Sequence, residues 1–350
     1  MSKILVYGHK GWIGEQVIQL LKTRFTRMVG EVKLGFSRVD DIESLQYELE
    51  LEKPTHVMAF IGRTHGKIGS KEYKTIDYLE QPGKLRENVR DNLFSPLSLA
   101  ILCQQLNIHF TYMGTGCIFD YDEDHPYPPA SDDPDVFESD MTIGFTEEDL
   151  PNFFASSYST VKGYTDRLMH LLENSVLNVR IRMPITSTVN GRNFITKIVN
   201  YEKICSIPNS MTVLPTLLPV MIDMALRKET GTINLVNPGL ISHNEILTLY
   251  KEIVDPSFTW QNFDLEEQSR ILAAGRSNNF LDTTKLTDKY PKVPNIRDAV
   301  IMCLKEMSKL SQQDQPKKIE TKPLVTSFVM PKISPKKEVN VLETEDNKNL

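Results

Sequence analysis

Short apolar runs alternate with stretches of helical spacing along the first half of the chain. Residues 4–7 form an apolar run followed by a glycine, and apolar residues then recur every three or four positions over 12–21. The same alternation predicts strands at 32–36, 56–61 and 110–113, and helices at 41–51 and 92–106. This order predicts an α/β fold in which helices cover both faces of a parallel sheet. Ligands of such sheets bind at the carboxyl ends of the strands.

The second half is less regular. An acidic, proline-rich stretch at 120–149 predicts a long exposed loop without an element of its own. The elements predicted after it are a helix at 159–173, strands at 178–182 and 231–235, and a helix at 244–253 that Ser242 begins. After residue 310 the chain contains no glycine, several prolines and lysines, and little periodicity. We therefore expect a disordered tail at 311–350.

The composition narrows the possible functions. Of the 350 residues, 40% are hydrophobic and 25% are charged, which allows a sizeable core. The net charge of −6 argues against nucleic acid or a membrane surface as a general partner. No apolar run approaches the roughly 18 residues that cross a bilayer, and the first residues lack a signal-peptide pattern. Four scattered cysteines predict neither a disulfide scaffold nor a metal site. We expect a cytoplasmic enzyme or binding protein.

A glycine-rich segment follows the first predicted strand and opens the first predicted helix. Glycines at such a turn let the backbone approach a pyrophosphate, and the helix N-terminus favours the anion. The spacing G-x-x-G-x-x-G resembles that of the short-chain dehydrogenase/reductase superfamily rather than that of the two-domain dehydrogenases. The expected cofactor contacts in this segment are Gly8, Gly11, Trp12, Ile13 and Gly14.

The end of the second predicted strand indicates which nicotinamide cofactor is bound. An NAD enzyme usually places an acid there, on the ribose 2′-hydroxyl. This chain has Ser37 and Arg38 instead, and a hydroxyl with a guanidinium suits a 2′-phosphate. The residues therefore favour NADPH. Asp40 and Asp41 lie close by, so NADH remains open.

Tyr158 and Lys162 lie four positions apart in a predicted helix and therefore share one face. A reductase needs an acid that protonates the carbonyl oxygen, and a tyrosine with a pKa of about 10 needs a nearby cation for this task. Lys162 would supply that charge and hold the nicotinamide ribose. Thr115 ends a predicted strand and would donate a hydrogen bond to the substrate carbonyl. Alone, the Tyr–Lys spacing is more often ordinary helix surface; together with the glycine segment it predicts a catalytic triad.

Longer segments carry a specific resemblance. They are 113–119 (MGTGCIF), 151–153 (PNF), 192–197 (RNFITK), 207–212 (IPNSMT), 255–260 (DPSFTW) and 276–279 (RSNN). Together they resemble the nucleotide-rhamnose synthase/epimerase-reductase family, which is similar to the dTDP-4-dehydrorhamnose reductases. The likeness runs from residue 3 to about residue 305, and residues 63–88 and 122–142 depart from the family pattern.

The resemblance implies the fold of an extended short-chain dehydrogenase/reductase. This is a Rossmann-type doubly wound parallel sheet with a smaller C-terminal substrate-binding lobe. We expect the NAD(P)-binding domain at 1–184, with some later segments returning to it, and mainly the substrate-binding lobe at 185–310. The implied partners are a nucleotide-linked 4-keto-6-deoxy sugar, a second copy in a homodimer, and an upstream 4,6-dehydratase.

The resemblance also implies a two-step reaction. C3 and C5 of a UDP- or dTDP-linked 4-keto-6-deoxy-glucose are inverted, and the C4 ketone is then reduced to give the L-rhamnose sugar. The implied acid–base pair is Cys117, which shares a strand side with Thr115, and Lys197. The implied substrate contacts are Asn193, Arg276 and Asn279, and further implied cofactor contacts are Gly62, Asn92, Met183 and Pro184.

Two alternatives remain open from the residues. The chain could be a 4-keto reductase without epimerase activity, because a lone cysteine after a strand is more often a small buried hydrophobe. It could also be a non-catalytic NADP-binding regulator. The presence of Thr115, Tyr158 and Lys162 together disfavours this second alternative.

Overall fold

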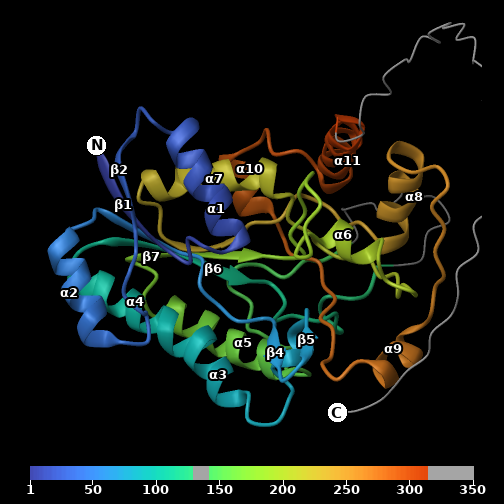
Figure 1. The fold of residues 1–350 in the computed structure, drawn as a ribbon, viewed down its shortest axis with the longest axis horizontal. Helices are drawn as coiled ribbons and strands as arrows, with labels where there is room; N and C mark the ends of the chain where they lie inside the picture. The colour runs from blue at the N-terminus through green and yellow to red at the C-terminus, as the bar shows by residue number, and fades with distance from the viewer. Residues whose placement is uncertain (129–141, 314–350) are drawn as a thin grey trace, which may run out of the picture. The chain divides into compact units, whose positions relative to one another are not determined.

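A six-stranded parallel sheet forms the centre of the fold (Figure 1). The computed structural model describes residues 1–128 and 142–313. The strands are ordered β2-β1-β3-β6-β7-β8 and all pair in parallel. Their bounds are β1 (Ser2–Tyr7), β2 (Val29–Leu34), β3 (His56–Ala59), β6 (His109–Thr115), β7 (Val176–Ile181) and β8 (Gly231–Asn234). The predicted α/β class is therefore confirmed, and the strand order reverses between β1 and β3, where such sheets bind ligands.

Helices cover both faces of this sheet because alternate strand residues point to opposite sides. On one face α1 (Trp12–Thr23) and α7 (Leu214–Leu226) pack on Ile4 and Val6 of β1. On the other face α2 (Ile42–Glu52), α4 (Ser95–Gln105) and α5 (Ser157–His170) lie over Leu5 and its neighbours (Figure 1). The apolar spacing predicted α1, α2, α4 and α5, with bounds that differ by a few residues, but it did not predict α7.

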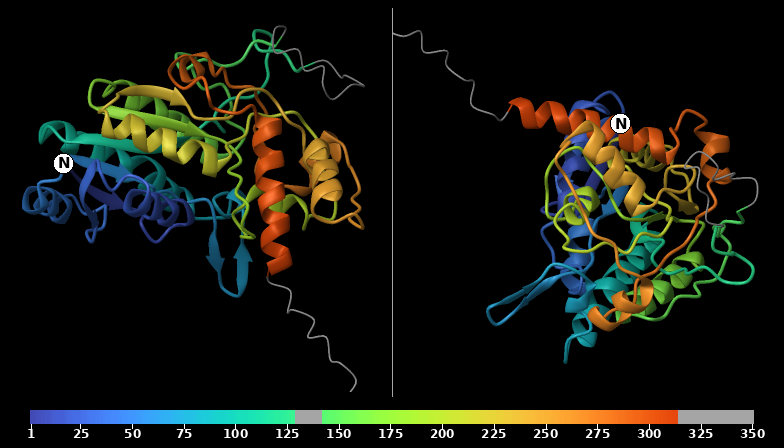
Figure 2. Two further views of the ribbon diagram at one scale, coloured as in Figure 1. Left: turned by 90° about the horizontal axis from the view of Figure 1, so that it is seen from above. Right: turned by 90° about the vertical axis from the view of Figure 1, so that its right-hand side faces the viewer.

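A separate apolar cluster forms the core of the later part of the chain. It joins α6 (Phe194–Ile198), α8 (His243–Ile253) and α11 (Ile296–Gln313), and Figure 2 shows α11 beside α8. Ser242 begins α8 through a reciprocal capping box with Glu245, as its position predicted. The short helices α9 (Leu265–Ile271) and α10 (Thr284–Lys289) complete this part, and Leu286 of α10 packs with the sheet cluster. A boundary at residue 184 stays a prediction.

The segment between β3 and α4 holds elements that the pattern did not predict. They are a hairpin of β4 (Gly66–Ile68) and β5 (Lys71–Tyr73), the turn η1 (Ile76–Tyr78), α3 (Leu85–Val89) and the π-helical turn η2 (Arg90–Phe94). The helix predicted from residue 92 thus starts earlier and is interrupted. Two-strand hairpins of this length carry too few side chains to leave a clear alternation.

Three other expectations need correction. The second strand ends at Leu34 because the N–H groups of Phe36 and Ser37 donate to the carboxylate of Glu48 instead of to a strand. The loop predicted at 120–149 is not exposed throughout, because Phe145 near its end is buried and stacks on Phe119 with ring centroids 4.5 Å apart. The predicted tail starts too early, because α11 continues to Gln313; the rest of 311–350, like 129–141, lies outside the described residues. Among the helices described, none is both long and apolar enough to span a membrane.

Candidate active site

A tight turn joins β1 to α1 at the carboxyl edge of the sheet. Gly8 has a φ of +73°, and a Cβ at this position would lie 2.5 Å from the carbonyl oxygen of Phe60. The N–H of Gly11 donates to the carbonyl of Gly8 at 2.9 Å, and α1 then begins at Trp12. Only glycine fits position 8, so the backbone comes close to anything bound above it. The first turn of α1, with Ile13 and Gly14, presents its N–H groups at the same edge, which suits an anion.

A hollow of about 540 Å³ adjoins this turn and the end of β2. Its lining includes Gly8, His9, Lys10, Phe36 and Ser37. The hydroxyl of Ser37 donates to the backbone of Ser44 at 3.0 Å, and the exposed Arg38 pairs with Asp40 at 2.9 Å. Asp41 does not face the hollow as a free acid, because it caps α2 by accepting the N–H of Ser44. The adenosine end of a dinucleotide fits this hollow.

Glu48 fixes the shape of this region. Its fully buried carboxylate accepts the N–H groups of Phe36 at 2.7 Å and Ser37 at 2.9 Å, and the hydroxyl of Tyr7 at 2.9 Å. Burial raises the pKa of Tyr7, and the Glu48 charge raises it further. An acid within an amphipathic helix is usually solvent-facing, so the sequence did not point to Glu48.

Thr115 and Tyr158 meet at the end of β6. Thr115 ends the strand and is buried, while Tyr158 lies in the first turn of α5. Burial raises the pKa of Tyr158, the nearby Cys117 adds to this, and a hydrogen bond with Thr115 opposes it. The structure therefore brings these two predicted residues together.

Lys162 has a partner that was not predicted. It is 4% exposed, and its Nζ donates a hydrogen bond to the hydroxyl of Tyr112 on β6 and lies 4.5 Å from the centre of that ring. The sequence predicts the phenol of Tyr158 beside this ammonium, but the hydroxyl of Tyr112 accepts its hydrogen bond instead. Burial lowers the pKa of Lys162 to about 8, although the charges of Asp166 and Cys117 raise it. No pattern in the sequence indicates Tyr112, because it lies fifty positions from Lys162.

Cys117 lies close to several of the predicted residues. Its N–H donates to Oγ1 of Thr115 at 3.1 Å, and its side chain is partly exposed, whereas the other three cysteines are buried. A charge on Cys117 acts on the pKa of Tyr158, Lys162 and Lys197. Burial lowers the pKa of Lys197 on α6, and the cation of Arg192 lowers it further. The phenol, the thiol and both amines therefore converge.

Arg276 is held by an acid from the segment that departs from the family pattern. Its Nη2 lies 2.5 Å from Oδ2 of Asp77, and Asp77 also accepts the N–H of Ala274 at 3.0 Å. Burial acts to raise the pKa of Asp77, but the hydrogen bond from Thr75 and the charge of Arg276 outweigh it, so the pKa is lowered. Arg276 also acts on the pKa of Lys197, which places both near one site.

Two predicted substrate contacts have other partners. Asn193 is fully buried as the N-cap of α6, and its Nδ2 donates to the carbonyls of Thr186 and Thr188 at 2.8 and 2.9 Å. Asn279 is also fully buried, and its Nδ2 donates to the carbonyls of Gly116 and Phe119. Neither amide is exposed to a ligand in this structure. The sequence showed the residue types but not the direction in which each side chain points.

The remaining predicted cofactor contacts surround the same edge. Asn92 lies in the π-helical turn, accepts the N–H of Arg63 at 2.8 Å and donates to its carbonyl at 2.9 Å. A Cβ on Gly62 would lie 3.0 Å from Oδ1 of Asn92, so this asparagine fastens the loop after β3. Met183 has a φ of +38° and precedes the partly buried Pro184. A non-glycine residue in this region is strained, and such strain collects at functional sites.

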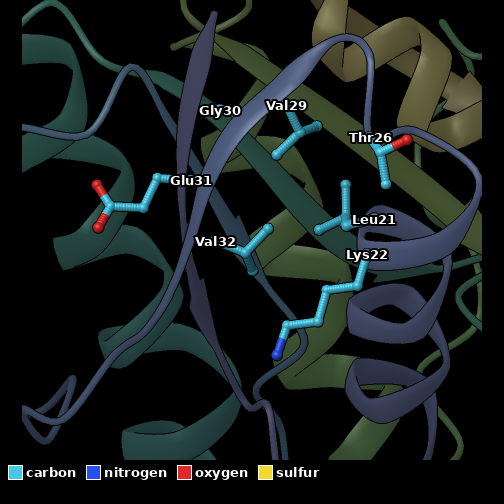
Figure 3. A pocket seen from close by; sticks show the side chains of 7 residues that line it. All are labelled: Leu21, Lys22, Thr26, Val29, Gly30, Glu31 and Val32. Carbon is cyan, nitrogen blue, oxygen red and sulfur yellow. The ribbon is translucent and has the colours of Figure 1, made fainter.

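Two further features lie apart from these residues. A hollow of about 200 Å³ lies between the end of α1 and the start of β2, far from the carboxyl edge (Figure 3). Its lining is Leu21, Lys22, Thr26, Val29, Gly30, Glu31 and Val32. Across residues 1–128 and 142–313, no group of three or more His, Cys, Asp or Glu side chains could hold a metal ion.

Comparison with known proteins gives close relatives, although no family model matches the chain. It is 55% identical over 294 residues to protein L780 of Acanthamoeba polyphaga mimivirus, covering 84% of this chain and 94% of that one. The crystal structure of that protein, a UDP-rhamnose synthase, superposes with a TM-score of 0.79 over 87% of this chain and 99% of the other. A bifunctional dTDP-4-dehydrorhamnose 3,5-epimerase/reductase of Arabidopsis thaliana is 41% identical over 309 residues, 88% of this chain and 94% of that one.

A longer relative contains a further activity. A trifunctional UDP-glucose 4,6-dehydratase/3,5-epimerase/reductase of Arabidopsis thaliana is 39% identical over 308 residues. The match covers 88% of this chain but 42% of that protein.

Proposed function

Because this chain belongs to the nucleotide-rhamnose synthase/epimerase-reductase family, we propose that it converts UDP-4-keto-6-deoxy-glucose to UDP-L-rhamnose. It inverts C3 and C5 of the sugar and then reduces the C4 ketone. The dTDP-linked sugar is the alternative substrate. The observation that carries the proposal is that Tyr158, Lys162 and Lys197, from separate stretches of chain, each lie close enough to Cys117 for its charge to act on their pKa.

NADPH is the proposed hydride donor. The residues fit a dinucleotide because position 8 excludes any side chain and a hollow of about 540 Å³ adjoins it. Gly8, Gly11 and the start of α1 would hold the pyrophosphate, and Lys162 the nicotinamide ribose. Ser37 and Arg38 would hold the 2′-phosphate, with Arg38 released from its exposed pair with Asp40. Met183 and Pro184 would pack against the nicotinamide.

Reduction of C4 needs a proton for the ketone oxygen. In the proposed mechanism Tyr158 gives this proton, and Thr115 donates a hydrogen bond that holds the same oxygen. Burial by itself raises the pKa of Tyr158 and would make it a poor acid. In the proposed mechanism the cation of Lys162, one helical turn away, offsets this by favouring the phenolate, which requires its ammonium to leave the hydroxyl of Tyr112.

Epimerisation needs an acid and a base on opposite faces of the sugar ring. The proposed pair is Cys117 and Lys197. One removes the acidic proton next to the C4 ketone and leaves an enolate, and the other returns a proton to the opposite face. Burial supports an acid–base role for Lys197, because it lowers the lysine pKa and so makes the neutral amine easier to form. Arg276 is the proposed contact of the nucleotide diphosphate.

The test is incubation of the full chain with the UDP- and dTDP-linked keto sugars and each nicotinamide, followed by NMR of the products. We expect UDP-L-rhamnose with NADPH. Cys117→Ser should abolish deuterium exchange at C3 and C5 while leaving reduction of an already inverted ketone. Exchange at the normal rate in Cys117→Ser would show that another residue is the acid or base. No NADPH oxidation by wild type with any substrate would contradict the function.

We also propose a homodimer built on α3, α4 and α5, which lie side by side in Figure 1. This surface carries exposed apolar side chains that water does not favour: Leu85, Val89, Phe94, Ile101 and Tyr164. The molar mass in solution tests this assignment. A 4,6-dehydratase upstream would supply the keto sugar. The four free thiols agree with a reducing compartment such as the cytoplasm.

A further inference from the structure

Two backbone carbonyls flank Cys117 in the turn after β6. The carbonyls of Gly116 and Phe119 accept hydrogen bonds from Nδ2 of Asn279 at 3.0 and 2.9 Å. The hydroxyl of Ser277 also donates to Phe119 at 2.6 Å. A single buried amide therefore joins both ends of the turn that carries the thiol.

A buried guanidinium supports the same turn from β7's side. Arg182 is 1% exposed, and its Nη1 donates to Gly116 at 3.4 Å and to Oγ of Ser277 at 3.0 Å. Its Nη2 donates to Oδ1 of Asn209 at 2.8 Å, and that oxygen also accepts the N–H of Asn279. Burial of a guanidinium is costly unless it is hydrogen-bonded, and the bonds of the two Nη atoms offset much of that cost, although Nε has no partner among the described residues.

There is little room for the turn to shift. A Cβ on Gly116 would lie 2.5 Å from Leu281 and 3.0 Å from Cγ of Arg182. The N–H of Cys117 is bound to Thr115, the residue proposed to hold the substrate carbonyl. Burial lowers the pKa of Arg182, and the charge of the nearby Cys117 opposes this.

We propose that Asn279 and Arg182 are positioning residues for epimerisation, which hold the backbone on both sides of Cys117 and so aim its thiol at the bound sugar. This inference rests on the proposed function. Asn279 thus acts through Cys117 and not by touching the substrate. Loss of the amide should misplace the thiol by a fraction of an ångström, and proton transfer is sensitive to such displacement.

The chain offers a matched control in Asn234 at the end of β8. It is fully buried, and its Nδ2 also donates to two carbonyls, those of Phe145 at 2.9 Å and Asp282 at 3.0 Å. In both asparagines Oδ1 has no hydrogen-bond partner among the residues that the structure describes. Asn234→Ala and Asn279→Ala therefore each remove a buried amide that bridges two carbonyls, and Asn279→Ala also removes a bond to Oγ of Ser277 at 3.1 Å. Only Asn279→Ala removes a bridge from the Cys117 turn.

The experiment measures the two half-reactions separately in the full chain. Deuterium uptake at C3 and C5 from D₂O, without cofactor, reports epimerisation. NADPH oxidation with a ketone already inverted at C3 and C5 reports reduction. We expect Asn279→Ala to slow uptake on the order of 10- to 100-fold while reduction changes less than about threefold. Asn234→Ala should leave the ratio of the two rates unchanged.

A milder variant keeps the test decisive if Asn279→Ala does not fold. Ser277→Ala removes the hydroxyl that donates to the carbonyl of Phe119. It should lower the ratio of the epimerisation rate to the reduction rate by about threefold. An unchanged ratio in the folded variants, or an equal change in Asn234→Ala, would overturn the inference. Absence of deuterium uptake in the wild type would instead overturn the proposed epimerase function.

Discussion

Replacement of Tyr112 by phenylalanine tests the electrostatics of the reductase site. The hydroxyl of Tyr112 accepts a hydrogen bond from the buried ammonium of Lys162, whose pKa burial lowers to about 8. Tyr112→Phe keeps the ring beneath the ammonium but removes this acceptor. The charged form of Lys162 is then stabilised less, so its pKa must fall further.

The size of the shift follows from the hydrogen bond. A hydrogen bond to a charged group is worth roughly 1.5–3 kcal/mol, and one pKa unit corresponds to about 1.4 kcal/mol. We therefore expect the pKa of Lys162 to fall by about one to two units. At pH 8 the protonated fraction then drops from about one half to between about one tenth and one hundredth, whereas at pH 6 about half or more of the lysine stays protonated.

The assay is the pH dependence of kcat/KM for reduction, together with that of NADPH binding by fluorescence. The alkaline limb should move down by about one to two pH units in both measurements. Tyr121→Phe is the control, because that partly buried phenol donates to the carbonyl of Pro208 at 2.9 Å and loses this bond in the variant. An alkaline limb that stays in place or moves up in Tyr112→Phe would refute the reasoning.

Three shorter predictions concern the cofactor and stability. Arg38→Ser should weaken NADPH binding about tenfold and leave NADH binding unchanged in a fluorescence titration, since only NADPH has a 2′-phosphate; equal weakening of both would contradict the assignment. Burial and the neighbouring His109 lower the pKa of His56 to about 4, so the unfolded chain, with a pKa near 6.5, takes up the proton first. Urea unfolding should therefore show stability falling by about 3 kcal/mol between pH 7 and pH 4, and less so in His56→Phe. Asp166→Asn should cost about 3–5 kcal/mol in the same assay, because Arg180 is fully buried with its Nη2 2.7 Å from this carboxylate; a loss under 1 kcal/mol would show that other groups compensate.

Local periodicity made much of the fold predictable. The apolar pattern places β1, the glycine turn and α1 correctly, because strand alternation and helical spacing each depend on residues only a few positions apart. Tyr158 and Lys162 share a helix face for the same reason, and Ser242 with Glu245 marks a helix start. These features needed no tertiary information.

The partners of buried polar groups were decided by the tertiary structure alone. Asn279 and Gly116 are 163 positions apart, and Lys162 and Tyr112 are 50 positions apart. The sequence showed that an asparagine and a lysine were present, but a side chain's direction depends on which distant strand or turn packs against it. A buried amide must bond to whatever polar groups the fold brings within reach. Packing therefore directed the side chain of Asn279 towards the backbone beside Cys117 and not towards the predicted substrate contact.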